Sequence, residues 1–252
     1  MASEKRFGYE WSIYHELNPL YEEQFKQWLG PISPDFIAGK RILDAGCGMG
    51  RNSYWCLKWG AGEIVAFDND PRTVEQARKT LSQFSNAKVE KDSIYGISYE
   101  NEFDMVFSIG VVQLLERPRE AVERLIRALK PGGTLLLWLY AREGNDFVLK
   151  VIDPLRRHFT SKLPPRWLDY FTYLLSVPFY AYLKMFRPRS EYYQRLQAFP
   201  FRNIHLILFD HLLPTVAWYF SKEESLKLLD GLDQKSAFYV NKNSWTVTGV
   251  KS

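Results

Sequence analysis

Three glycines at alternate positions follow a short apolar segment with an acidic end, in the stretch Arg41-Ile-Leu-Asp-Ala-Gly-Cys-Gly-Met-Gly-Arg51. An amphipathic segment, residues 52–59, comes next, and a second apolar run, Glu63–Phe67, closes on Asp68. This order is typical of a strand, a glycine turn, a helix and a second, parallel strand. Glycine has no Cβ, so the backbone can turn sharply there and a ligand can approach it closely. The pattern predicts an α/β fold with a ligand at the glycine turn.

The spacing of the glycines discriminates between two nucleotide ligands. A dinucleotide fingerprint reads G-x-G-x-x-G and holds a pyrophosphate at the helix N-terminus, whereas Gly46, Gly48 and Gly50 read G-x-G-x-G. Asp44 precedes the first glycine by two residues. Its carboxylate is unhelpful beside a pyrophosphate and suits a ligand with an ammonium or sulfonium group. Asp68 follows Gly46 by 22 residues, where an exposed carboxylate at a strand tip can bind two ribose hydroxyls.

The chain resembles the class I S-adenosylmethionine-dependent methyltransferases, in particular bacterial enzymes that act on small molecules. The segments that carry the resemblance are, in order, Leu43–Gly50, Val65–Asp68, Asp92–Ser93, Phe103–Gly110 and Leu129–Leu136. The resemblance implies an α/β, doubly wound, Rossmann-like sheet of seven strands, mostly parallel with a reversed last strand. It also implies S-adenosyl-L-methionine as the cofactor and S-adenosyl-L-homocysteine as the product.

The resemblance also assigns a cofactor site, whose residues follow the ends of four expected strands. Within it, Asp44 would contact the amino group of the cofactor, Asp68 the ribose hydroxyls, and Asp92 the adenine amino group. The glycine loop and the residues after the fourth strand would line the methionine end. The full predicted set is Asp44, Gly46, Cys47, Gly48, Gly50, Asp68, Asn69, Asp92, Ser93, Ile109 and Gly110.

Catalytic residues are harder to assign, because methyl transfer from a sulfonium mainly requires alignment of the reacting atoms. A base is needed only if the acceptor must lose a proton. The candidates are Tyr140 after the fifth strand, His211 and Gln113, with a purely structural role as the alternative for each. Gln113 lies in Val111-Val-Gln-Leu-Leu115, where many relatives read Val-Leu-His-His-Leu. Any catalytic task of those histidines is therefore lost here, or moved to Gln113 or His211.

Periodicity and turn residues predict the remaining elements. Residues 73–85 and 119–129 are expected to be helices, the second ended by Pro131-Gly-Gly133, and 89–91, 105–108 and 134–140 strands. Ser221 is followed three residues later by Glu224, the capping-box signature of a last helix. Residues 236–240 and 245–250 are expected to form a hairpin. Asp104 opens a buried strand and is expected to cap backbone groups.

Residues 141–220 interrupt this alternation and are predicted to form a helical, aromatic and basic cap over the acceptor site. The core would then comprise 40–140 and 221–252, and residues 1–39 a helical lead-in or lid in which Trp11 or Tyr14 could touch the cofactor. Residues 150–202 contain ten Lys/Arg, three Asp/Glu and 13 aromatic residues, a net charge of +7.

The uncharged stretch Tyr170–Leu183 has 14 residues, too few for a membrane span, and Pro178 is expected to interrupt it. We interpret it as a pair of cap helices whose apolar faces cover the acceptor pocket. The alternative is a helix that lies in a membrane interface, because basic residues border the stretch. Peripheral membrane contact is therefore compatible with the sequence.

The cysteine pattern and the N-terminus bear on metal binding and compartment. Cys47 and Cys56 are nine residues apart, with no C-x-x-C and no clustered histidines, so no metal site and no disulfide framework are expected. The polar start, Met-Ala-Ser-Glu-Lys-Arg, lacks the apolar core of a signal peptide. A cytoplasmic location is therefore expected.

Together these features predict an enzyme that methylates a small, apolar or aromatic acceptor, with a negative group on the acceptor as the match for the basic cap. The alternatives are an RNA or protein methyltransferase, or a methyltransferase fold that has lost turnover and acts as a binding protein. Basic residues among aromatics would suit RNA, but the pI of about 8.9 is modest and no RNA-binding module is recognisable. The expected partner is a small molecule, and a nucleic acid is not expected. The protein is expected to be a monomer or a homodimer.

Overall fold

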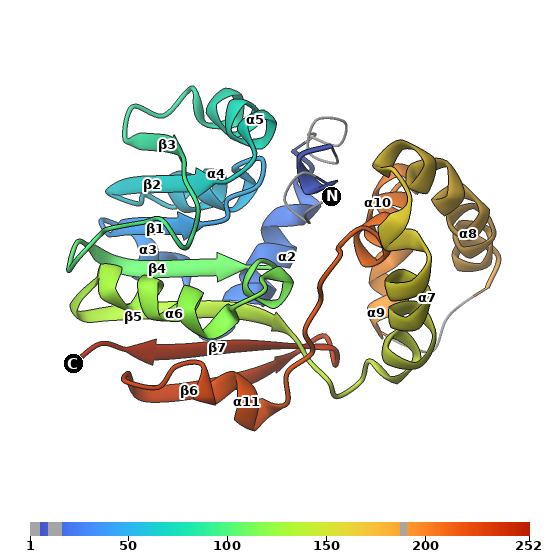
Figure 1. Cartoon of the computed structure of the whole chain (residues 1–252). Helices are drawn as coiled ribbons and strands as arrows, with labels where there is room; N and C mark the ends of the chain where they lie inside the picture. The colour runs from blue at the N-terminus through green and yellow to red at the C-terminus, as the bar shows by residue number, and fades with distance from the viewer. Residues whose placement is uncertain (1–5, 10–16, 187–190) are drawn as a thin grey trace. The chain divides into compact units, whose positions relative to one another are not determined.

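The computed structural model describes residues 6–9, 17–186 and 191–252 of the chain. They divide into two compact units (Figure 1). The core unit contains residues 7–145 and 216–252, and the helical unit contains residues 146–215 together with Arg6. Trp11 and Tyr14, the predicted lid residues, lie outside the described residues.

A seven-stranded sheet of order β3-β2-β1-β4-β5-β7-β6 forms the centre of the core unit (Figure 1). The strands are β1 (Arg41–Ala45), β2 (Glu63–Asp68), β3 (Ala87–Lys91), β4 (Phe103–Ile109), β5 (Leu129–Tyr140), β6 (Asp233–Val240) and β7 (Ser244–Val250). Strands β1 to β5 are parallel, and β7 is antiparallel to both of its neighbours. The predicted doubly wound, Rossmann-like sheet with a reversed last strand is confirmed.

Helices cover both faces of the sheet, which explains why its central strands are almost entirely apolar. One face packs on α2 (Leu20–Leu29), α3 (Pro34–Ile37), α4 (Arg51–Lys58) and α5 (Pro71–Leu81). The other packs on α6 (Pro118–Ala128) and on the segment that follows α11 (Lys222–Lys227). Alternate residues of one strand enter different cores, as Leu43 and Ile42 of β1 do.

Local signals set the helix ends. Asp70 caps α5, accepting a hydrogen bond from the backbone N of Arg72 at 2.9 Å. The predicted capping box of Ser221 and Glu224 is present at the start of α11. The helix predicted over residues 73–85 ends earlier, at Leu81.

The start of β5 corrects another expectation, that Pro131-Gly-Gly133 only ends a helix. Helix α6 ends at Ala128, and β5 begins at once with Leu129. The backbone N of Gly132 donates to the O of Lys251 at 2.8 Å, and the N of Lys251 donates to the O of Gly133 at 2.9 Å. These two bonds to the chain after β7 hold Gly132 and Gly133 within β5.

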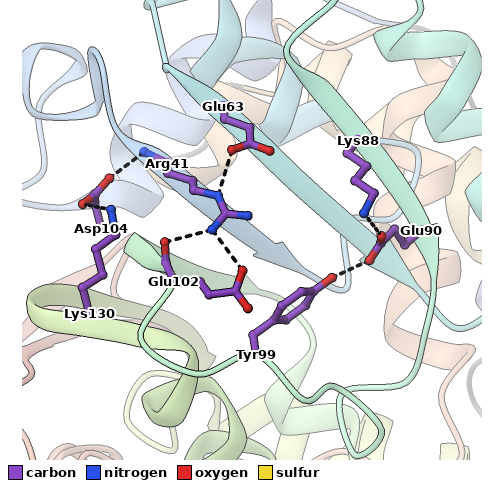
Figure 2. Close-up of polar contacts among 8 residues, drawn as sticks. All are labelled: Arg41, Glu63, Lys88, Glu90, Tyr99, Glu102, Asp104 and Lys130. Carbon is purple, nitrogen blue, oxygen red and sulfur yellow. Dashed lines mark hydrogen bonds and ion pairs between the residues drawn. The ribbon is translucent and has the colours of Figure 1, made fainter.

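A network of charged side chains ties the amino ends of the strands together (Figure 2). Arg41 of β1 forms ion pairs with Glu63 at 2.8 Å and with Glu102 at 3.0 Å. Asp104 accepts a hydrogen bond from the backbone N of Arg41 and forms an ion pair with Lys130, both at 2.8 Å. Asp104 therefore has the capping role predicted for it. The network lies at the edge of the sheet opposite to the glycine loop.

The helical unit contains the segments η2 (Val148–Ile152), α7 (Asp153–His158), η3 (Thr160–Lys162), α8 (Pro165–Met185), α9 (Glu191–Leu196) and α10 (Phe201–Leu212). Its longest helix, α8, packs on α10. The side chain of Arg6 is buried and donates to backbone carbonyls of Thr160, Ser161, Leu163 and Leu213.

The course of α8 corrects the expected break at Pro178, because the helix runs through this residue without interruption. Pro178 is solvent-exposed, so the carbonyl freed by its missing N–H can bind water. Among the described residues, no helix combines the length and apolar character needed to cross a membrane.

Candidate functional site

The glycine loop, residues 46–50, connects β1 to α4 at the carboxyl edge of the sheet. Its three glycines all have positive φ, between 54° and 81°. The backbone N atoms of Gly46 and Cys47 donate to the O of Phe67 at 3.0 and 2.9 Å, which folds the loop against the end of β2. A Cβ on Gly46 would lie 2.5 Å from Cγ2 of Val111. The loop therefore requires glycine at this position for both conformation and space.

Asp68 stands at the carboxyl end of β2 and is half-buried, not exposed as predicted. The loop folds over it: Oδ2 accepts from the backbone N of Gly48 and Oδ1 from that of Asp70, both at 3.1 Å. Burial raises the pKa of Asp68, and these hydrogen bonds oppose the rise. A carboxylate has about four lone-pair positions, so Asp68 retains acceptor capacity for ribose hydroxyls.

Asp44 lies beneath the loop and is almost completely buried. Its Oδ2 accepts a hydrogen bond from Oγ of Ser53 at 2.6 Å. Burial raises the pKa of Asp44 to about 7, with the negative charge of Asp68 adding to the rise and the Ser53 hydrogen bond opposing it. A positively charged ligand beside the loop would hold this carboxyl ionised. The carboxylates of Asp44 and Asp68 therefore fit a ligand with an ammonium or sulfonium group.

The residues predicted to surround adenine follow β2 and β3. Asn69 is exposed next to Asp68. Asp92 is half-buried, its backbone N donates to the O of Asp68 at 3.1 Å, and its Oδ1 accepts from the N of Ser93 at 2.7 Å. Backbone pairing thus brings this part of the predicted set to one edge of the sheet.

Gly110 follows Ile109, the last residue of β4, and has a φ of 77°. A Cβ on Gly110 would meet no atom within 4 Å. Its backbone N donates to the O of Trp138 at 3.3 Å, which fixes the turn next to β5. The backbone at Gly110 is therefore open to the close approach of a ligand.

Gly8 is a site-rim residue that sequence reasoning missed. A Cβ on Gly8 would lie 2.1 Å from Cγ of Asp70. Asp70 is buried and forms an ion pair with Arg72 at 2.8 Å. The N-terminal segment therefore packs directly on the carboxylate two residues after Asp68. The available signal was a glycine between two aromatic residues, Phe7-Gly-Tyr9.

A row of half-buried aromatic side chains runs along the carboxyl end of β5, and sequence reasoning named only Tyr140 among them. Trp28 of α2 contacts Trp138 with ring centroids 5.1 Å apart, and Trp138 meets Tyr140 edge-on at 5.7 Å. Tyr140 stacks on Tyr219 at 5.5 Å. We call Trp28, Trp138, Tyr140 and Tyr219 the aromatic row. Such a row offers flat apolar surface with polar tips.

Two catalytic candidates, Gln113 and Tyr140, lie in the core unit. They contact Trp218 and Tyr219, which are neighbours in the sequence. Gln113, in η1 (Val112–Leu114), is completely buried, and its backbone O accepts from the N of Trp218 at 2.8 Å. Tyr140 stacks on the next residue, Tyr219. Within the described part of the chain, neither polar atom of the Gln113 side chain has a hydrogen-bond partner. A buried amide left in this state is costly, so it is a candidate for contact with a polar ligand.

The third candidate, His211, lies on α10 in the helical unit. Burial lowers its pKa, and the positive charge of Arg156 lowers it further. His211 is thus held toward the neutral form, which is the form that can accept a proton. The described residues contain no group of three or more His, Cys, Asp or Glu side chains arranged to hold a metal.

Comparison with known proteins agrees with this geometry. Residues 42–133 match the family model of a methyltransferase domain. The mitochondrial ubiquinone biosynthesis O-methyltransferase of Schizosaccharomyces pombe is 34% identical over 110 residues, covering 42% of this chain and 40% of the relative. The chain spans about half the length of the first curated relatives that it matches.

Two solved structures share the fold across almost the whole chain. An S-adenosylmethionine-dependent methyltransferase from Thermotoga maritima has a TM-score of 0.56 at 18% identity and covers 99% of this chain and 100% of its own. Magnesium protoporphyrin IX methyltransferase from Synechocystis, solved with S-adenosylhomocysteine bound, has a TM-score of 0.56 at 14% identity and covers 94% and 89%.

The fold, the glycine loop and the family model over residues 42–133 together support a methyltransferase domain of the class I, S-adenosylmethionine-dependent type in the core unit. S-adenosylmethionine is the cofactor of the class, so the predicted cofactor is confirmed at the level of the family.

Proposed function

We propose that this protein transfers the methyl group of S-adenosylmethionine to a hydroxyl of a small aromatic acceptor. The observation that carries the cofactor half is the buried Asp44 beneath the glycine loop, with Asp68 at the tip of β2. The acceptor half is supported by the aromatic row, and by a relative named for O-methylation in ubiquinone biosynthesis.

The chain's own residues would divide the work as follows. S-adenosylmethionine, when bound, supplies an activated methyl group on a positively charged sulfur. Asp44 would pair with positive charge, and Asp68 would accept from the ribose hydroxyls. Gly110 would let the methionine end of the cofactor approach the backbone closely, and Gly46 would give the loop the conformation that this requires. Alignment of donor and acceptor supplies most of the acceleration.

The acceptor would be oriented by Tyr140 and Gln113. The Tyr140 hydroxyl can donate or accept a hydrogen bond, and the Gln113 amide can do both but cannot take a proton at neutral pH. Gln113 would therefore position a polar group of the acceptor without acting as the base. An acidic phenol needs little or no base, because part of it is already ionised near neutral pH.

Calorimetric titration with S-adenosylmethionine, S-adenosylhomocysteine and NAD tests the cofactor. We expect the first two ligands to bind and NAD not to bind. Asp68→Ala should lose binding, because the ribose hydroxyls and the Gly48 amide both lose their acceptor. The matched control is Asp104→Ala, which removes a half-buried carboxylate from the opposite edge of the sheet and should leave binding unchanged.

Three results would contradict all or part of the proposal. Binding of NAD in place of S-adenosylmethionine would make the loop a dinucleotide site. Equal binding by wild type and a folded Asp68→Ala variant would remove Asp68 from the site. If cofactor binds and phenolic acceptors are not methylated while RNA is, the acceptor half of the proposal fails alone.

A further inference from the structure

The exposed face of α8 is more apolar than that of an ordinary surface helix. A helix at the surface of a water-soluble protein buries its apolar stripe and exposes its polar one. On α8, the exposed face carries large apolar and aromatic side chains. We call this set the α8 outer face, and it consists of Trp167, Tyr170, Leu174, Val177, Tyr182 and Met185. Trp167 is 64% exposed, Leu174 70% and Met185 75%.

The opposite face of α8 buries two hydroxyl groups together with Leu168 and Leu183. Thr172 and Ser176 are completely buried there. The hydroxyl of Thr172 donates a hydrogen bond to the backbone O of Leu168 at 2.8 Å. Oγ of Ser176 lies 2.8 Å from Nδ1 of His205 on α10. Nε2 of the same ring lies 2.8 Å from Oδ1 of Asp169.

The chain Ser176–His205–Asp169 therefore joins α8 to α10 by hydrogen bonds within the helical unit. Its serine is completely buried, so the three residues resemble a hydrolytic triad in type but the hydroxyl is not accessible as a nucleophile. Polar groups that face a neighbouring helix, behind an apolar outer surface, are the arrangement of helices surrounded by lipid.

Basic residues border the α8 outer face. Arg166 and Lys184 lie 18 residues apart, which is five helical turns, so both fall along one edge of the face. Both are exposed, as is Lys162 just before the helix. Long basic side chains at the edge of an apolar face can reach lipid headgroups while their stems stay on the apolar surface. Trp167 and the two tyrosines are of the type enriched at membrane interfaces.

We propose that the α8 outer face docks on the surface of a bilayer that contains anionic lipids, with α8 parallel to the membrane plane. The apolar side chains enter the boundary between headgroups and acyl chains, and Lys162, Arg166 and Lys184 meet the negative headgroups. Charge argues against a second copy of the chain as the occupant. A two-fold interface with the two α8 helices antiparallel would bring the same basic edge of each copy toward the other.

Vesicle flotation of the full chain tests this proposal. The probes are vesicles of phosphatidylcholine alone and of phosphatidylcholine mixed with phosphatidylglycerol. We expect flotation with the anionic vesicles only, weakened at high ionic strength because screening removes the headgroup attraction. The double variant Leu174→Glu/Met185→Glu should reduce the bound fraction about tenfold or more. Lys162→Glu/Arg166→Glu should also reduce it.

The control is Phe36→Glu, which places one glutamate on an exposed apolar residue of α3 in the core unit. This variant should float like the wild type. Circular dichroism would establish that each variant is folded. If the double variant fails to fold, Leu174→Cys with an environment-sensitive dye replaces it. Its emission should shift to the blue on addition of anionic vesicles, and a dye at Phe36→Cys should not shift.

Several outcomes would overturn the proposal. One is a wild-type protein that floats with neither vesicle. Another is equal flotation of wild type and Leu174→Glu/Met185→Glu. A third is a wild-type dimer that the double variant converts to a monomer, without vesicle binding by either, which would assign the face to a second copy. These results are independent of whether the core unit binds S-adenosylmethionine.

Discussion

Asp44 shows how one side chain connects stability to ligand binding. The Asp44 carboxyl is buried, and the hydroxyl of Ser53 donates a hydrogen bond to it. The negative charge of Asp68 lies close enough to raise the pKa of Asp44. In the cofactor-free protein this arrangement is unfavourable for the ionised form. A cationic ligand reverses the preference. Ionisation of Asp44 therefore has an unfavourable free energy in the cofactor-free site, and a bound cationic ligand would remove it.

The first prediction concerns the pH dependence of stability. The pKa of Asp44 is raised from 3.8 to about 7 by burial, so the folded chain binds this proton more tightly than the unfolded chain. The resulting stabilisation is complete below pH 3.8 and is lost as the pH rises through about 7. This rise in the pKa of Asp44 corresponds to roughly 4 kcal/mol in the free energy of unfolding.

Urea unfolding across this pH range would measure the effect. The free energy of unfolding of the cofactor-free wild type should fall as the pH rises, and Asp44→Asn, which cannot ionise, should show a smaller fall. Raising S-adenosylmethionine should restore stability to the wild type at pH 8 more than to the variant. Parallel pH curves for the two proteins would show that Asp44 does not titrate in this way.

The second prediction separates strain from space in the glycine loop. Gly46→Ala places a Cβ at a φ of 79° and 2.5 Å from the Val111 side chain. Gly132→Ala has a similar φ of 77° and no atom within 4 Å, so it is a matched control for strain alone. Each should lose about 1 kcal/mol of stability from the left-handed conformation.

Only Gly46→Ala should also lose cofactor affinity, because relief of the clash moves the loop or Val111. Thermal unfolding gives the stability of both variants, and calorimetry gives their affinity. Unchanged binding by Gly46→Ala would mean that the loop does not contact the ligand.

The sequence predicts the glycine loop and the position of Asp68 well, because the signals for both are local. Glycines at fixed spacing need positive φ, and acidic residues at strand ends meet at one edge once the strands are parallel, so residues 44–50 and Asp68 could be placed in advance. The half-burial of Asp68 and the approach of Gly8 to Asp70 could not. Both depend on contacts between segments far apart in the chain, and no local pattern encodes those.

At the scale of elements, apolar runs and capping residues in the sequence predict the strands and most helices. They do so because burial and backbone hydrogen bonding act on neighbouring residues. The errors arose where tertiary pairing competes with a local rule. At residues 130–133, hydrogen bonds to Lys251 hold the Pro-Gly-Gly bend inside β5, where Gly132 keeps a φ of 77° and the register with β4 shifts. In α8, packing on α10 carries the helix through Pro178.

The third prediction follows from that proline. Pro178→Ala restores a backbone N–H and removes the ring from an exposed position of α8. The penalty of an interior proline is about 3 kcal/mol, and part of it has been absorbed by the surrounding packing. We therefore expect the helical unit to gain roughly 1–3 kcal/mol.

Hydrogen exchange of the α8 amides would measure this gain. Val177→Ala, the adjacent exposed position, is the control and should change protection by less than about 0.5 kcal/mol. A Pro178→Ala variant with faster exchange would show that the proline is favourable in this helix.

At the scale of the whole molecule, residues 146–215 leave and re-enter the core unit at one place. The backbone N of Arg142 donates to the O of Phe220 at 2.9 Å, and the Arg142 side chain forms an ion pair with Glu224 at 2.7 Å. Asn145 is tied to the core unit by hydrogen bonds of 2.7 Å to the O atoms of Ala141 and Asn243. The sheet and the predicted cofactor residues therefore have their contacts without the intervening helices.

The last prediction tests this independence. Residues 146–215 would be replaced by a short Gly-Ser linker between Asn145 and Val216. Because the ends are already held close by the Arg142–Phe220 hydrogen bond, closing the loop costs little. We expect the shortened chain to fold and to bind S-adenosylmethionine with nearly unchanged affinity, since every predicted cofactor residue lies in the core unit.

The shortened chain should nevertheless lose two properties of the full one. Flotation with anionic vesicles should disappear with α8, and methylation of an aromatic acceptor should fall sharply if the helical unit covers the acceptor as predicted. Calorimetry, flotation and a methyl-transfer assay measure the three properties on one protein. A folded core that no longer binds S-adenosylmethionine would place part of the cofactor site in the helical unit. Full retention of acceptor methylation would instead remove the helical unit from acceptor recognition and leave membrane docking as its role.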